Sequence, residues 1–217
     1  MARTFKLIEN YIYLYHTGVF ILIPTYPESV SDSMSANFSP TTPLARTAPI
    51  QSYTGSGPRT VRVKLDLHRD LMTQINTKAS NALINIYKSL GMIDQNATSS
   101  SLPENFADDY VDILIKNIQA IAYPTYSDAA RQVDPPQIAL RFGNDIFIKG
   151  VVNGSVSVEY SGPILSNDKY AMVGISFDVT EIDPQSAQTV SLLGSFRGDS
   201  SKLDNQFYNG ISSVTRV

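Results

Sequence analysis

Apolar and polar residues alternate most regularly between residues 60 and 69, in the stretch "TVRVKLDLHR". One side of an extended chain would carry Val61, Val63, Leu65 and Leu67, and the other side would carry Arg62, Lys64, Asp66 and His68. Because successive side chains of a strand point to opposite faces, this pattern predicts a strand with one buried and one polar face. The polar face is either solvated or a polar contact between copies of the chain, and the pattern leaves both interpretations open.

An apolar stretch near the start, "YIYLYHTGVFILIPTYP", is rich in β-branched and aromatic residues. Its composition predicts a pair of strands that turn near His16, Thr17 and Gly18. Because the stretch is interrupted at the turn and ends at Pro24, it is shorter than the roughly 20 residues that span a bilayer. It also lacks the small-residue cleavage site of a signal peptide, so we do not interpret it as one. We expect no membrane insertion of the chain.

The second half contains a series of short apolar runs that follow a double proline, Pro135 and Pro136. Prolines cannot donate to a strand ladder, so they mark the entry into a sheet, and "QIALRF" is the first predicted strand. Turns at 143–145 and 153–154 separate it from "IFIKGVV" and "SVSVEY", and "AMVGISFDVTEI" follows as a fourth strand. We expect these four strands to form a meander.

Two segments have helical spacing. Residues 70–90 predict one helix or two short ones, ending near Gly91. The stronger pattern covers 104–123, with a stripe formed by Tyr110, Ile113, Leu114, Ile118 and Ile121. Its acidic residues Glu104, Asp108 and Asp109 lie near the positive N-terminal end, and Pro124 ends the helix.

Two further segments lack sustained periodicity. Residues 28–58 are rich in Ser, Thr, Pro and Gly and predict a long loop, which is either laid on a partner or a floppy insertion. Residues 183–217 are polar and turn-rich and predict an extended C-terminal arm, in which only "VSLLGSF" could add a strand. We therefore expect a domain over 1–182 and an arm over 183–217.

The composition of the 217 residues limits the function. Hydrophobic residues make up 42% of the chain and charged residues only 17%, so uncharged polar side chains must cover much of the surface. The net charge of -3 and the absence of a basic cluster argue against specific nucleic-acid binding. Without cysteine there is no disulfide, thiolate nucleophile or cysteine-bound metal, and the cytosol is the default place of assembly.

Residues that could carry chemistry do not form a convincing set. The two histidines lie in different elements without matching carboxylates, which supports neither a zinc site nor a catalytic triad. Asp108 and Asp109 are adjacent on a helix and point about 100° apart, so they cannot converge on one reacting atom. "GSGPRT" precedes a strand and lacks the lysine of a phosphate-binding loop. We predict no catalytic residue, no cofactor and no metal.

Taken together, the elements predict an α+β fold: a mainly antiparallel β-sandwich or small barrel with one or two covering helices and extended arms. The order of a helix, "AYPTY", "PPQIALRFG", "IFIKGVVNGSVSVEYSGP" and "KYAMVGISFDVTEI" resembles the tail-tube-like domain of contractile injection systems and contractile phage baseplates. The resemblance covers about 106–182, with a looser match over 50–71. The matching positions are Pro135, Pro136, Phe142, Gly143, Phe147, Gly150, Val151, Tyr160, Thr180 and Glu181.

This resemblance implies a structural virion protein at the tail baseplate, assembled in the host cytoplasm. Such a protein forms a ring, expected to be a hexamer, that joins the baseplate hub or spike to the tail tube and initiates tube polymerisation. The implied partners are further copies of the chain, tail tube subunits and hub proteins, and Arg62, Lys64, Asp66 and His68 are the expected subunit interface. Relatives often carry tryptophan in the aromatic-glycine turn, whereas this chain has Phe142 and no tryptophan.

Alternatives to a tube initiator are another tail ring protein, either the major tube subunit or the tube terminator. In a different class, a small glycan-binding or hydrolytic β-domain is also compatible with an antiparallel sheet. We expect no peptidoglycan-binding module after the tube-like domain, because too few residues follow it.

Overall fold

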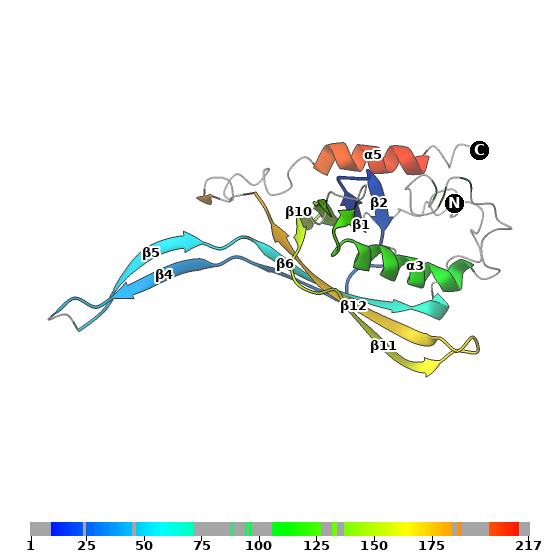
Figure 1. Cartoon of the computed structure of the whole chain (residues 1–217), viewed down its shortest axis with the longest axis horizontal. Helices are drawn as coiled ribbons and strands as arrows, with labels where there is room; N and C mark the ends of the chain where they lie inside the picture. Colours follow the sequence, from blue (N-terminus) through cyan, green and yellow to red (C-terminus); the bar gives the residue numbers. More distant parts are fainter. Residues whose placement is uncertain are drawn as a thin grey trace, which may run out of the picture.

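The fold is built on one large antiparallel sheet, seen in a computed structural model (Figure 1). The structure describes residues 10–23, 25–44, 47–71, 88, 94, 96, 106–126, 132–133, 137–183, 186–187 and 200–212. The eight strands of the sheet are β1 (Asn10–Leu14), β2 (Val19–Leu22), β3 (Ser29–Ser33), β6 (Thr60–His68), β9 (Ile138–Phe142), β10 (Ile146–Val152), β11 (Ser157–Ile164) and β12 (Tyr170–Glu181). Their order is β2-β1-β9-β10-β12-β6-β3, with β11 beside β12.

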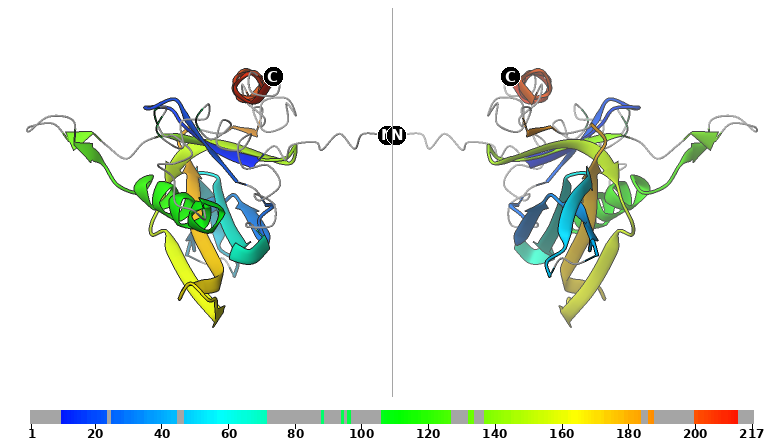
Figure 2. Two further views of the ribbon diagram at one scale, coloured as in Figure 1. Left: turned by 90° about the vertical axis from the view of Figure 1, so that its right-hand side faces the viewer. Right: turned by 90° about the vertical axis from the view of Figure 1, so that its left-hand side faces the viewer.

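Strand β10 is the corner at which the sheet changes direction. Its first part pairs with β9, and its last three residues pair with the end of β12. Gly150 belongs to both ladders, and a Cβ atom there would lie 2.1 Å from the backbone oxygen of Thr180. Only glycine allows this close approach of two backbones. The sheet therefore divides into one half with β1, β2 and β9 and another with β3, β6, β11 and β12, and Figure 2 shows the two halves crossing.

The regular alternation around residues 60–69 behaves as predicted. In β6 the residues Val61, Val63, Leu65 and Leu67 are buried, and β12 buries Val173, Ile175, Phe177 and Val179 in the same way. The predicted pair at the start of the chain is also confirmed, because β1 and β2 are antiparallel neighbours around the turn at His16. The mainly antiparallel α+β fold is therefore confirmed.

The helix predicted over 104–123 is α3 (Phe106–Ala120), which lies between the two halves of the sheet (Figure 1). Tyr110, Leu114, Ile118 and Ile121 are buried as the stripe predicts, whereas Ile113 is only half-buried. The hydroxyl of Tyr110 donates a hydrogen bond to the backbone oxygen of Leu22 at 2.8 Å, which ties the helix to β2. The helix predicted over 70–90 lies largely outside the described residues.

A second helix, α5 (Ser200–Ser212), contradicts the predicted extended conformation of the C-terminal segment. It lies on the side of β1 and β2 opposite α3 (Figure 1). Leu203 and Phe207 are buried, and the ring of Phe207 stacks on Tyr11 with centroids 4.9 Å apart. The sequence shows no clear helical stripe, because Leu203 and Phe207 are the only fully buried residues among those described in this helix. "VSLLGSF" lies outside the described residues, and the division at residue 182 stays a prediction.

The long loop predicted over 28–58 is also wrong, because this segment contains β3 and a separate hairpin of β4 (Ala36–Thr41) and β5 (Ile50–Ser56). The hairpin projects far from the body (Figure 1). Almost all its side chains are exposed on both faces. A strand with no buried face has no reason to alternate in polarity, so its sequence resembles a loop.

The predicted meander needs one correction. The chain does not reverse at Asn153 and Gly154, because β10 and β11 run in the same direction along one edge of β12. Gly154 has a φ of +89° in the irregular stretch between the two strands. The turn between β9 and β10 is confirmed, with Gly143 at a φ of +54°. A two-residue strand pair, β7 (Thr125–Tyr126) and β8 (Gln132–Val133), stands apart from the sheet.

Candidate assembly surfaces

The outward side of the β3-β6-β12-β11 layer is polar, and its side chains are mostly short. We call it the polar face; it is formed by Ser29, Ser31, Arg62, Lys64, Asp66, His68, Met172, Gly174, Ser176, Asp178, Ser157, Glu159 and Ser161. The cross-strand register places Lys64 beside Ser29 on one neighbour and Ser176 on the other. The four residues singled out in β6 do lie together on this face. Their role as a subunit interface stays a prediction.

Both basic residues of the polar face, Arg62 and Lys64, are paired within the chain. Arg62 donates two hydrogen bonds of 2.9 Å to the carboxylate of Asp178, and the ammonium of Lys64 lies 2.5 Å from Glu28. The hydrogen bond from Arg62 is the main cause that lowers the pKa of Asp178, and the hydrogen bond from Lys64 lowers the pKa of Glu28 in the same way. The two basic side chains of the face are therefore each paired with a carboxylate from or next to a neighbouring strand, while Asp66 and Glu159 add further acidic groups to it.

The same layer has two open edges. Within the described residues, β3 pairs only with β6, and β11 pairs only with β12. Each pairing in the series β3, β6, β12, β11 is antiparallel, so strand direction alternates across the layer. The two edge strands therefore run in opposite directions. Unpaired backbone groups along such edges are a template for adding a further strand.

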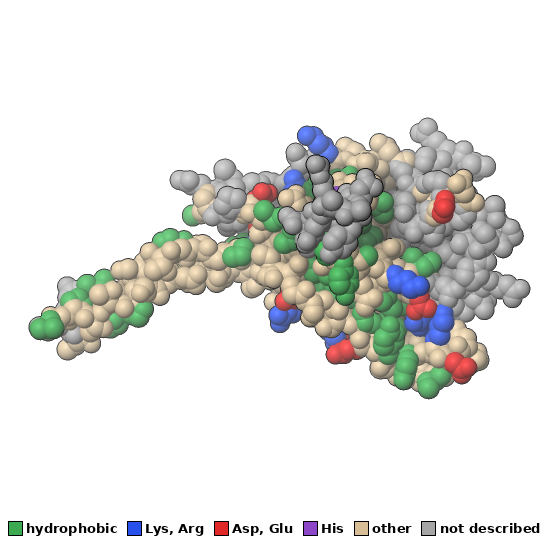
Figure 3. All heavy atoms as spheres, in the orientation of Figure 1, with side chains coloured by type: hydrophobic (Ala, Val, Ile, Leu, Met, Phe, Trp, Pro, Cys, Tyr) green, Lys and Arg blue, Asp and Glu red, His purple; other side chains and the backbone are tan. Residues whose placement is uncertain are grey.

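The β4–β5 hairpin, which we call the arm hairpin, carries no charged side chain in its two strands. Figure 3 shows no acidic or basic colour along its described part. Phe38 and Tyr53 are 55% and 60% exposed and touch across the ladder, with ring centroids 5.6 Å apart. Leu44, beyond the last ladder pair, is fully exposed. Large uncharged side chains exposed in this way are typical of an interaction surface.

The base of the arm hairpin is fixed to the body by Arg59. This side chain is only 4% exposed, and it binds the carboxylate of Asp32 at 2.7 Å and the backbone oxygen of Phe147 at 3.1 Å. The bond to Asp32 is bidentate, since the Nε atom also donates to the carboxylate. A bidentate guanidinium holds a defined geometry. The arm is therefore held where it leaves the body, next to the corner strand β10.

Asp112 joins α3 to the end of β6 and to the turn before β12. Its carboxylate accepts hydrogen bonds from Arg69 at 2.6 Å and from Lys169 at 2.8 Å. Burial alone would raise the pKa of Asp112, but the hydrogen bonds and charges of Arg69 and Lys169 outweigh it and hold the pKa below its ordinary value. This cluster has a structural task, because it connects elements that are distant in sequence.

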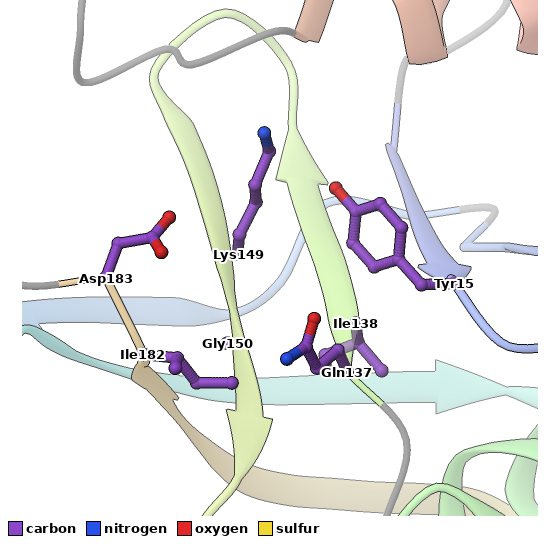
Figure 4. A pocket seen from close by; sticks show the side chains of 7 residues that line it. All are labelled: Tyr15, Gln137, Ile138, Lys149, Gly150, Ile182 and Asp183. Carbon is purple, nitrogen blue, oxygen red and sulfur yellow. The ribbon is translucent and has the colours of Figure 1, made fainter.

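A pocket of about 240 Å³ lies where β1 and β12 end and β9 begins (Figure 4). It is lined by Tyr15, Gln137, Ile138, Lys149, Gly150, Ile182 and Asp183. Neither Lys149 nor Asp183 forms an ion pair with any described residue. No sequence pattern indicates this pocket, because its residues come from four separate segments that only the folded corner brings together.

The positions that carry the family resemblance mostly have structural roles. Phe142 and Phe147 are buried, Gly143 is in the turn, and Gly150 permits the sheet corner. Val151, Thr180 and Glu181 belong to the ladder at that corner, and Tyr160 is 52% exposed on β11. Pro135 and Pro136 lie outside the described residues.

No group of three or more His, Cys, Asp or Glu residues in the described part of the chain could hold a metal ion. Among the described helices, none combines the length and apolar character needed to cross a membrane.

No family model matches the chain, and no curated protein matches its sequence. Among the solved structures that align with it are two gene transfer agent particles, both at low similarity. A chain from the tail of an empty gene transfer agent particle with C6 symmetry is 12% identical, with a TM-score of 0.36 over 86% of this chain and 100% of that chain. A chain from the virion of a native gene transfer agent particle is 11% identical, with a TM-score of 0.35 over 84% of this chain and 100% of that one. Both scores are too low to establish a common fold.

Proposed function

We propose that this chain is a structural protein of a phage-type contractile tail, which forms a ring at the baseplate, joins the hub to the tail tube and initiates tube polymerisation. The observation that carries the proposal is the pair of open edges on the β3-β6-β12-β11 layer. The finer assignment to a tube initiator, in place of a tube subunit or a terminator, comes from the resemblance over 106–182.

The alternation of strand direction explains how a ring could close. When a second copy stands beside the first in the same orientation, its β3 lies next to the first copy's β11. These two strands are antiparallel, because the layer has an even number of strands and every pairing within it is antiparallel. The joint therefore continues the existing pattern. Repeating the same step is a head-to-tail contact, which closes into a ring if the rotation allows it.

The size of such a ring follows from strand spacing. About six copies with four strands each, spaced about 4.8 Å apart, would have a circumference of about 115 Å and a diameter of about 37 Å for untilted strands. Tilting the strands widens the barrel. The polar face suits one side of this wall, because its two basic side chains are already paired within the chain.

The arm hairpin supplies the contact to a neighbouring tail component. Its two strands carry no charged side chain, and it projects from the layer and is fixed at its base, so it loses little conformational freedom when a partner binds it. In a tube initiator, a preformed ring with ordered contact arms spares the first incoming tube subunits the cost of nucleation. The protein would then be part of the virion, after assembly in the host cytoplasm.

Two proline variants of β11 test the ring contact, Glu159→Pro and Tyr160→Pro. Of two adjacent residues in an edge strand, one directs its N–H group toward β12 and the other directs it outward. Proline removes the N–H group. One variant therefore loses a hydrogen bond to β12, and the other loses only a donor that faces away from β12 and is available to a neighbouring copy. We expect the variant that melts like the wild-type chain to lose ring formation, measured as mass by light scattering.

The variant that melts at lower temperature serves as the internal control for damage to the fold. If the fully stable variant still forms rings of wild-type mass, the edge of β11 is not the contact and the proposal fails in this form.

A further inference from the structure

The pocket at the sheet corner and the tip of the arm hairpin are complementary, and neither has a partner in the described chain. We propose that the pocket is the receptor for Leu44 of a neighbouring copy. The inference rests on the proposed function, since it requires copies of the chain to assemble side by side or in stacked rings.

The size of the pocket favours a single side chain as its occupant. Its volume of about 240 Å³ lies below the range of roughly 300–1,000 Å³ that is usual for small-molecule sites. The apolar part of its lining comes from Ile138, Ile182 and the ring of Tyr15. Ile182 and Tyr15 are 49% and 40% exposed, so the pocket has apolar surface left to bury.

The rim of the pocket carries one donor and one acceptor that have no ion-pair partner in the described chain, Lys149 and Asp183. Figure 4 shows Asp183 at one side of the pocket and Lys149 between Asp183 and Tyr15. An apolar centre with a polar rim is the usual anatomy of a protein contact. The backbone groups of Thr42 and Leu44, which lie beyond the ladder, suit this rim because they offer carbonyl oxygens to Lys149 and N–H groups to Asp183.

Leu44 is the side chain that fits these conditions. It is fully exposed, lies beyond the last ladder pair at Thr41 and Ile50, and follows a strand that carries no charged side chain. The arm projects away from the body, so its tip does not reach the pocket of the same chain (Figure 1). A contact between Leu44 of one copy and the pocket of another is heterologous, because it joins two different surfaces. Each copy carries both surfaces, so the same contact can link a series of copies.

The chain has no cysteine, so paired cysteine variants can test the contact cleanly. We would mix the isotope-labelled Leu44→Cys chain with the unlabelled Ile182→Cys chain, oxidise the mixture with diamide and identify the linked peptides by mass spectrometry. We expect a disulfide between the labelled and the unlabelled chain as the main cross-linked species.

Two matched controls use other exposed apolar residues. Tyr53→Cys lies on the same arm but away from its tip, and Ile164→Cys lies on the exposed end of β11. We expect the cross-link to be lost when Tyr53→Cys replaces Leu44→Cys, and when Ile164→Cys replaces Ile182→Cys. Each replacement keeps an exposed thiol, so random collisions alone would preserve the cross-link.

The possible outcomes separate the two proposals. This inference would be overturned, and the ring proposal would stand, if rings form without a link between positions 44 and 182. The same holds if position 44 links to position 164 in its place. Chains that stay single and give no cross-link would overturn both.

Discussion

Replacing Phe207 with alanine tests whether the C-terminal helix belongs to the folded body. Phe207 is 1% exposed, stacks on Tyr11 at 4.9 Å and touches Phe20 at 5.4 Å between ring centroids. Removing a buried phenylalanine costs about 3–5 kcal/mol, the sum of lost burial and the cavity that remains. We expect the free energy of unfolding to fall by about 3 kcal/mol, at the lower end of this range, because a helix at the surface can shift to close part of the cavity.

A loss of this size is large beside the stability of about 5–15 kcal/mol that is usual for a folded protein. Urea unfolding followed by circular dichroism measures it as a lower midpoint with an unchanged slope. The control is Tyr208→Ala on the same helix, where the side chain is 38% exposed and the change should cost clearly less. If Phe207→Ala and Tyr208→Ala both leave the midpoint unchanged, the docking of α5 on β1 is wrong.

Two further variants test the corner and the helix anchor. Gly150→Ala should destabilise the chain by about 1–3 kcal/mol in urea unfolding, because its Cβ atom would meet the backbone of Thr180. Gly174→Ala is its control, since the nearest atom there is the flexible end of Asp66 at 3.3 Å, and equal effects would argue against a special corner. For Asp112, folding lowers the pKa from its ordinary value of 3.8, so its stabilising effect is present above about pH 4 and is lost as the pH falls below that value. Asp112→Asn should therefore lower the melting temperature most at pH 7, and a difference from wild type that stays constant down to pH 3 would contradict this reasoning.

How far the sequence predicts this fold depends on burial. The β6 and β12 strands and the α3 helix each bury one face, so their polarity follows the period of the element, and their positions could be predicted. The arm hairpin buries neither face, and α5 buries only Leu203 and Phe207 among its described side chains, so neither leaves a clear pattern. The corner at Gly150 could not be predicted, because it depends on pairing with residues about 30 positions away.

The candidate surfaces could also be predicted from the sequence only in part. Alternation alone places Arg62, Lys64, Asp66 and His68 on one face, as the structure has them. It does not show that Arg62 and Lys64 are paired with Asp178 and Glu28, because those partners depend on the register of neighbouring strands. The pocket and the open edges likewise arise only from the order of strands in the sheet.

The central claim is that the two open edges of this layer are completed by other copies of the same chain. Native mass spectrometry of the purified full-length protein over a series of concentrations, with negative-stain images of the same samples, tests it most directly. The account predicts closed rings of about six copies, with a mass of about 143 kDa built from chains of 23.8 kDa. A single 23.8 kDa species at every concentration, with no rings in the images, would contradict it.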